Sequence, residues 1–195
     1  SAARRLVELL GKLKTGDYVN VPGFYDGISP IPEKEMEIIK SIPSVNKEIE
    51  NAYGTKPICD EQDFYIKLNN APTFNISLMN SGATSSVVPA VAMANIDIRL
   101  VPGQMPDDIF NKVEQYIRKL GYEDVEVIKT SGIEPSKTDI NTPYLPIVEK
   151  ATKEIYGKYV TYPIRPSTAP DFLWTNILRL PAIQVRWTDP DSDNH

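Results

Sequence analysis

The residues best suited to chemistry lie on one face of an alternating stretch, residues 91–101. Apolar side chains alternate there with Asn95, Asp97 and Arg99, the pattern of a half-buried β-strand with one polar face. A guanidinium offers a planar pair of donors that matches a carboxylate, so Arg99 could bind an acidic group. An ordinary solvated strand face would give the same pattern. Both interpretations, a carboxylate-binding site and a solvated face, therefore stay open.

A second candidate site is the polar stretch 188–195, which joins three aspartates to His195, the single histidine of the chain. It follows an apolar segment, residues 182–187, that we predict to be a strand. Open α/β sheets keep their ligand sites in loops after the carboxyl ends of strands. One histidine cannot complete a metal site, and a lone histidine is more often a surface or core residue. This stretch therefore predicts one metal ligand at most.

Other site motifs are weak or missing. Residues 80–89 collect small hydroxyl side chains, including Ser86, but by themselves they indicate only a polar hairpin loop. The sequence contains no glycine-rich phosphate loop and no CxxC, HExxH or GxSxG motif. The site types built on those motifs are therefore excluded.

Composition narrows the class of protein further. With 195 residues, 41% of them hydrophobic, the chain suits one medium domain or a small domain with part of another. A net charge of -5 without a dense basic run argues against nucleic acid as a partner. The single cysteine, Cys59, cannot form an internal disulfide, so a reduced, cytoplasmic setting is expected. No stretch has the length of a membrane span or the order of a signal peptide, so no membrane association is expected.

The first part of the chain predicts an α+β domain. The sequence signals for helices are apolar spacing of three and four and terminal Pro or Gly, and they indicate helices over residues 2–13, 33–40, 45–53 and 106–120. Alternation predicts strands over residues 73–79, 91–101 and 124–129. The first of these strands should direct Phe74, Ile76 and Leu78 to one face. The order gives an antiparallel sheet with helices on one face, and it lacks only an opening strand.

The character of the sequence changes near Pro135, where we place a domain boundary. Helices alternate with strands after it, over residues 144–156, 160–164, 170–178 and 182–187. This order predicts part of a parallel α/β sheet. Because it has only two strands, the second part is not expected to be stable alone.

Taken together, these stretches resemble the M20 metallopeptidases, a family that includes carnosinase-like dipeptidases, acetylornithine deacetylase and succinyl-diaminopimelate desuccinylase. The resemblance runs through nearly the whole chain, and residues 96–104 are its most specific segment. It implies a lid or dimerisation domain over residues 1–134, with a four-stranded antiparallel sheet, two helices on one face and the opening strand missing. Residues 135–195 would be a partial C-terminal α/β segment of the zinc-peptidase catalytic domain. Since Ser1 begins inside a helical pattern, we expect an excised fragment.

The resemblance also implies roles for individual residues. Arg99 would bind the substrate carboxylate, Ser86 and Thr168 would contact substrate, and His195 would be the last metal ligand. The loop that carries Thr168 departs from the family's pattern, because it lacks the usual glycine pair. The substrate would be a small peptide or an N-acyl amino acid, and the partner would be a second copy bound through the lid.

The catalytic chemistry of such an enzyme would lie outside this chain. The intact protein would use two divalent metal ions, zinc by resemblance, whose bridging water attacks the amide carbonyl. The remaining metal ligands and the catalytic glutamate would precede Ser1, so the fragment is expected to be inactive, with an incomplete metal site or none. Two alternatives remain: a non-catalytic α+β dimerisation or binding module that shares the lid fold, and a purely structural acidic domain.

Overall fold

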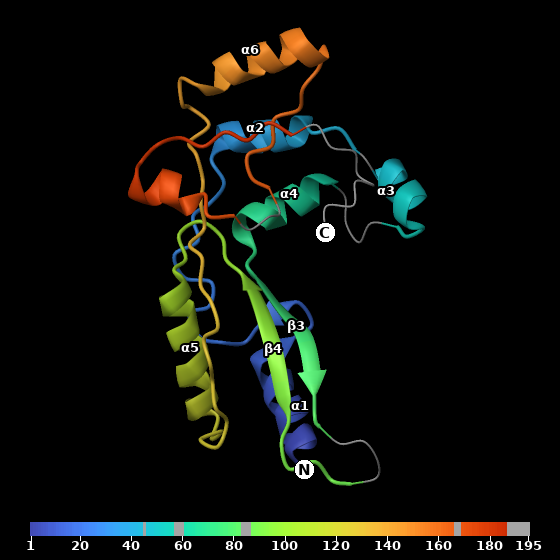
Figure 1. The fold of residues 1–195 in the computed structure, drawn as a ribbon, viewed down its shortest axis with the longest axis vertical. Coiled ribbons are helices and arrows are strands. Elements are labelled where there is room, and N and C mark those ends of the chain that lie inside the picture. Colours follow the sequence, from blue (N-terminus) through green and yellow to red (C-terminus); the bar gives the residue numbers. More distant parts are fainter. Residues whose placement is uncertain (45, 57–60, 83–86, 166–168, 187–195) are drawn as a thin grey trace. The chain divides into compact units, whose positions relative to one another are not determined.

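A computed structural model describes residues 1–44, 46–56, 61–82, 87–165 and 169–186. The chain divides into two compact units (Figure 1). The first unit contains Ser1–Ile28 and Pro72–Glu134, and the second contains Ser29–Ala71 and Pro135–His195. One break between the two units falls at Pro135. Residues 29–71 belong to the second unit.

The first unit opens with helix α1 (Ala2–Leu13), whose bounds are those that the apolar spacing predicts. Ser1 caps it, because its hydroxyl accepts a hydrogen bond from the backbone N–H of Arg4. A two-stranded sheet follows, made of β1 (Lys14–Thr15) and β2 (Tyr18–Val19). The chain then runs through residues 21–28, which no helix or strand contains.

Strands β3 (Thr73–Asn80) and β4 (Met93–Arg99) form the main antiparallel hairpin of the first unit. Its register pairs Ile76 with Ile96 and then Leu78 with Asn95, so Ser77 is an extra residue. Such a bulge moves every following side chain to the opposite face. The prediction that Leu78 shares the face of Phe74 is therefore wrong.

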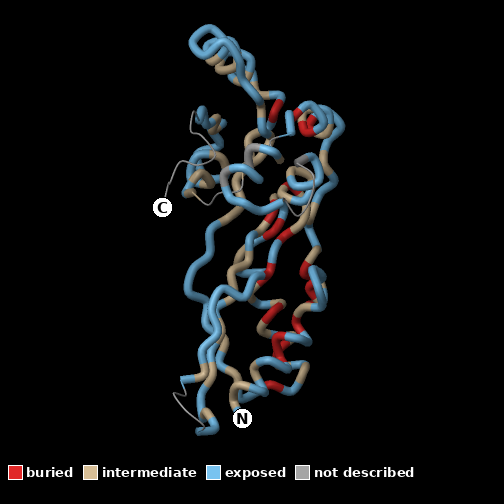
Figure 2. Tube along the Cα trace, turned by 90° about the vertical axis from the view of Figure 1, so that its right-hand side faces the viewer, coloured by how far each residue is buried: buried red, intermediate tan, exposed pale blue. Residues whose placement is uncertain are grey.

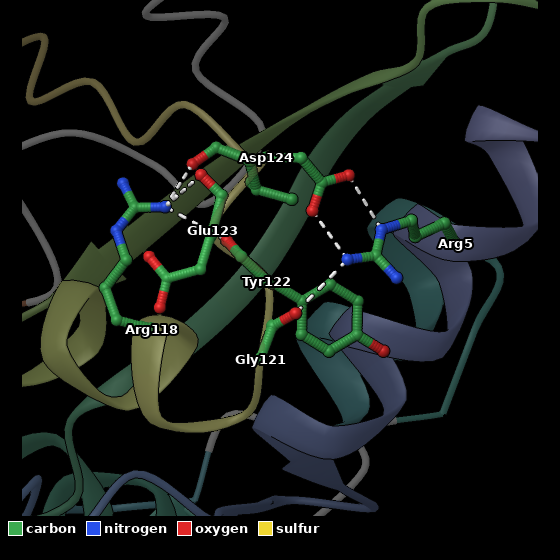
Figure 3. Close-up of polar contacts among 7 residues, drawn as sticks. Arg5, Arg118, Gly121, Tyr122, Glu123 and Asp124 are labelled. Atoms are coloured by element: carbon green, nitrogen blue, oxygen red, sulfur yellow. Dashed lines mark hydrogen bonds and ion pairs between the residues drawn. The ribbon is translucent and has the colours of Figure 1, made fainter.

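Residues 124–129, expected to be a strand, belong to no sheet in the described part of the chain. The predicted alternation is nevertheless present, because Val125 and Val127 pack against the core. Helix α5 (Pro106–Lys119) precedes this segment, and its Arg118 donates hydrogen bonds to the carbonyls of Tyr122, Glu123 and Val125 (Figure 3). The described residues thus form two two-stranded sheets and not a four-stranded one. A strand needs a hydrogen-bonded neighbour, and no described residues pair with this segment.

One apolar core holds the first unit together (Figure 2). Its buried side chains come from α1, β2, residues 21–28, β3, α5 and the segment that follows α5. They are Leu9, Leu10, Leu13, Val19, Val21, Phe24, Phe74, Ile109, Val113, Ile117 and Tyr122. Ile96 and Ile98 of β4 pack against it as the alternation predicts. Helices α1 and α5 therefore share the face of the hairpin that carries these residues.

An ion pair joins α1 to the segment that follows α5 in the first unit. Arg5 of α1 donates hydrogen bonds to both carboxylate oxygens of Asp124 at 2.8 and 2.5 Å, and to the carbonyl of Gly121 at 3.2 Å (Figure 3). Its guanidinium also lies 4.5 Å from the ring centroid of Tyr122. The hydrogen bond from Arg5 holds the pKa of Asp124 below its ordinary value.

The regular elements that the structure describes in the second unit are all helices. Its helices are α2 (Glu33–Ser41), α3 (Asn46–Tyr53), α4 (Glu61–Asn70), α6 (Leu145–Tyr156) and the π-helical turn η1 (Leu173–Ile177). Helix α4 was not predicted. The strands predicted over 160–164 and 182–187 are wrong as far as residue 186, the last one described there. Among all described helices, none is long and apolar enough to cross a membrane.

Polar contacts explain why residues 29–71 join the second unit. Lys137 donates to Glu35 of α2 at 2.5 Å and to Asn69 of α4 at 3.2 Å, and both of these partners are buried. The Thr138 hydroxyl lies 2.9 Å from both the carbonyl oxygen and the backbone nitrogen of Ala182. The segment after Pro135 is thereby anchored to two helices that precede it by many residues.

Candidate functional site

Arg99 is the last residue of β4 and pairs with Thr73, the first residue of β3. Its backbone N–H donates to the Thr73 hydroxyl at 3.3 Å. The apolar neighbour Ile98 packs toward the core, whereas the Arg99 side chain is 57% exposed. The predicted polar face is thus confirmed at this end of the strand.

Asp97 orients the guanidinium of Arg99. The two side chains are two residues apart and so lie on the same face of the strand. Arg99 Nε donates to Asp97 Oδ2 at 2.7 Å. An exposed pair of this kind adds little to stability, about 0–1 kcal/mol, so its main effect is to fix the direction of the guanidinium. Sequence reasoning noted both residues but missed this pairing, which the period of two could have indicated.

The turn after Arg99 is held to residues 21–28 from inside the first unit. Val101 and Gln104 are buried, and the Gln104 side chain bridges the backbone of Val101 and Phe24. Nearby, Lys112 of α5 lies 2.7 Å from Asp108 and 3.6 Å from Asp26. The hydrogen bond to Asp108 raises the pKa of Lys112. Sequence reasoning assigned no role to Gln104, because its partner is eighty residues away.

The other three candidate residues, Ser86, Thr168 and His195, lie outside the described residues. On either side of the segment that contains Thr168, Arg165 Nη2 and Asp171 Oδ2 lie 3.7 Å apart. The roles of Ser86, Thr168 and His195 stay predictions from the resemblance.

The metal centre that the resemblance implies can be tested against the side chains present. Among the described residues no group of three or more His, Cys, Asp or Glu side chains could hold a metal ion. Metal centres of catalytic type need about three protein ligands. The described residues alone therefore do not fit such a centre.

A family model for the peptidase dimerisation domain of M20 proteins matches residues 1–125. Curated relatives include the beta-Ala-His dipeptidases of Mus musculus, 23% identical over 164 residues, and Rattus norvegicus, 25% identical over 165 residues. Each alignment covers 78% of this chain and 33% of the relative. The chain thus spans about a third of the length of these relatives.

Solved structures resemble this chain over most of its length. An M20 family metallo-carboxypeptidase from Sulfolobus solfataricus superimposes with a TM-score of 0.82 at 26% identity, over 92% of this chain and 48% of that one. Human carnosine dipeptidase 1 superimposes with a TM-score of 0.73 at 20% identity, over 91% of this chain and 40% of that one. The second likeness concerns the fold alone. With a family model that matches well over half of its residues, the chain belongs to the M20 peptidase family.

Proposed function

We propose that this chain is the substrate-recognition and dimerisation portion of a metal-dependent hydrolase of amide or peptide bonds. The observation that carries the proposal is Arg99, exposed at the end of β4 and directed by Asp97. A guanidinium held in one direction can bind a carboxylate through two parallel hydrogen bonds without first losing rotational freedom. Arg99 therefore binds the carboxylate of a small peptide or N-acyl amino acid substrate.

The rest of the active site is proposed from the resemblance and from the names of the relatives, which are dipeptidases and a metallo-carboxypeptidase. Ser86 and Thr168 would contact substrate, and His195 would supply one metal ligand. Two divalent ions, zinc by resemblance, would activate the attacking water in the intact enzyme. The catalytic base and the remaining ligands would lie outside this chain. No step of the reaction is carried by the described residues beyond holding the substrate carboxylate.

The finer domain assignment is also a proposal. As the resemblance implies, residues 1–134 would be the lid or dimerisation domain and residues 135–195 a part of the catalytic domain. Residues 29–71 are then a part of the lid that is grouped with the second unit. A further strand would complete the lid sheet to four strands, with residues 124–129 as one of them. Support comes from Val125 and Val127, which face the same core as Ile96 and Ile98.

Dimerisation is assigned to the first unit because the dimerisation-domain model, which matches residues 1–125, covers most of that unit. The surface formed by α1 and the neighbouring end of β3 would bind a second copy of the chain. A hollow of about 330 Å³ lies in the second unit, which the dimerisation proposal does not involve. An apolar hollow of about 150 Å³ in the first unit lies beside α1 and β3. It is lined by Ala3, Leu6, Val7, Met79, Asn80, Ser81 and Ala92. Val7 and Met79 are half exposed there, which suits contact with another apolar surface.

The experiment that tests the recognition role compares two arginines in the full-length enzyme. Arg99→Ala should lower kcat/KM for a dipeptide substrate by about 30-fold or more, a loss of about 2 kcal/mol, since a charge-assisted contact is removed. Arg4→Ala is the matched control, because Arg4 is also exposed and also bonded to one carboxylate, that of Glu8. Unchanged kinetics for Arg99→Ala would overturn the proposed role.

A further inference from the structure

Gln104 is a buried polar side chain whose two ends are both used. It is 3% exposed. Its Nε2 donates to the Phe24 carbonyl at 2.6 Å, and its Oε1 accepts from the Val101 N–H at 3.2 Å. Only a side chain with a donor and an acceptor at this length can make both bonds, and a buried polar group left without a partner is costly. Gln104 thus joins the turn after β4 to residues 21–28.

Two glycines bring the same two segments into direct backbone contact. Gly27 has φ +81° and Gly103 has φ +99°, both in the region that disfavours other residues. A Cβ on Gly103 would lie 2.0 Å from the carbonyl oxygen of Gly27, and a Cβ on Gly27 would lie 2.5 Å from that of Gly103. The two segments can therefore approach this closely only where both residues are glycine.

The contact acts on the end of β4. Val101, whose N–H Gln104 holds, is two residues after Arg99. On the other side, the backbone N–H of Arg99 is held by Thr73. The main chain at Arg99 is thus fixed from its strand neighbour and from the turn that follows it, and the direction of its side chain depends on both.

We infer that Gln104 is a positioning residue for Arg99, acting through Val101 and the paired glycines. The inference rests on the proposed function, in which Arg99 binds the substrate carboxylate. Gln104 does not touch substrate. It keeps the guanidinium in the direction that allows its bond to Asp97, and so keeps the carboxylate site formed before substrate arrives.

The test uses the 195-residue chain and needs no ligand. The side-chain Nε–Hε resonance of Arg99, assigned by its loss in Arg99→Lys, reports the bond to Asp97, and Asp97→Asn supplies the reference for a weakened bond. In Gln104→Met this resonance should move toward its position in Asp97→Asn, and amide exchange at Val101 should rise about tenfold. Gly27→Ala, which strains the same contact from the other segment, should move it in the same direction.

Val113→Ala is the matched control. It removes buried volume from the core on α5 and leaves the two hydrogen bonds of Gln104 in place. At equal loss of thermal stability it should leave the Arg99 resonance in place. An Arg99 resonance that stays unchanged in Gln104→Met and Gly27→Ala, while Val101 exchange rises, would overturn the inference and leave Gln104 a structural residue only. Because no substrate is present, this result is independent of whether Arg99 binds a carboxylate, which the kinetics of Arg99→Ala decide.

Discussion

The two units differ in how they are held together. Apart from Ile39, Ile42 and Ile140, every buried apolar side chain among the described residues belongs to the first unit. The second unit relies on polar anchors such as Lys137 with Glu35. Helix α6 has no buried residue, and Ile155 on it is 73% exposed. Burial supports the first unit by itself, whereas the second presents apolar surface that its described residues do not cover.

The largest expected difference between the units follows from removing one apolar side chain from each. Phe74→Ala should lower the free energy of unfolding of the first unit by about 3–5 kcal/mol, because a fully buried ring is lost. Ile155→Ala, on the exposed face of α6, should change that of the second unit by less than about 0.5 kcal/mol. Hydrogen exchange of peptides from each unit measures both. Equal losses would remove the distinction.

The polar anchor of the second unit gives the next effect. Lys137→Met leaves the buried carboxylate of Glu35 without its partner, and should destabilise the second unit by about 3 kcal/mol. The double variant Glu35→Met with Lys137→Met removes both charges and should recover most of that loss. Urea unfolding followed by hydrogen exchange in the second unit checks this. A double variant no more stable than Lys137→Met would show that the ion pair is not the anchor.

The apolar surfaces of the two units should respond differently to a charge. Val7→Glu places a carboxylate on the α1 surface proposed for dimerisation, and should weaken a homodimer about a hundredfold, ~2.7 kcal/mol. Ile155→Glu makes the same change on α6 and should leave the dimer intact. Sedimentation over a concentration series distinguishes them. Dissociation by the α6 variant alone would move the interface to the second unit.

The smallest effects concern one aspartate in each unit. The hydrogen bond from Arg5 lowers the pKa of Asp124, and the backbone hydrogen bond from Asn141, with that residue's side chain, lowers the pKa of Asp139. A carboxyl whose pKa is lowered by folding stabilises the protein above its ordinary pKa of 3.8, and this is lost as pH falls through and below it.

The two aspartates should separate by salt dependence. Asp124→Asn should remove an acid-dependent loss of stability that added salt also reduces, because its partner is a charge. Asp139→Asn should remove an acid-dependent loss of stability that salt reduces less, because the two largest causes of its lowered pKa are hydrogen bonds from Asn141, and the charges of Lys34 and Lys137 contribute less. Thermal unfolding from about pH 5 to about pH 3, at low and high salt, measures both. Equal salt dependence would contradict the assigned causes.

Sequence patterns predicted the elements whose stability is local. Helix α1 has the predicted bounds because its apolar spacing is local and Ser1, the residue before it, caps its start. Helix α4 was missed because Phe64, Tyr65 and Ile66 are adjacent, so their side chains spread around the helix and form no single apolar face. Alternation could not reveal the bulge at Ser77, which is one residue with no local signal. The segments predicted as strands after Asp124 belong to no sheet among the described residues, because a strand also requires a hydrogen-bonded neighbour, which the pattern of one segment does not supply.

The candidate site shows the same limit. Arg99 and its exposed face follow from the period of a strand, and Asp97 could have been inferred as its partner. The contact of Gln104 with Phe24 joins residues far apart in sequence and no local pattern contains it. The positions of Ser86, Thr168 and His195 relative to Arg99 stay predictions.

The most direct test of the central claim pairs the Arg99 variant with a change in substrate. In the full-length enzyme, kcat/KM is measured for a dipeptide with a free carboxylate and for the same dipeptide with a carboxamide, using the native residue and Arg99→Ala. We expect Arg99→Ala to reduce the value for the carboxylate substrate by about 30-fold or more and to leave the carboxamide value unchanged. An equal reduction for both substrates, or none for either, would contradict the claim that Arg99 binds the substrate carboxylate.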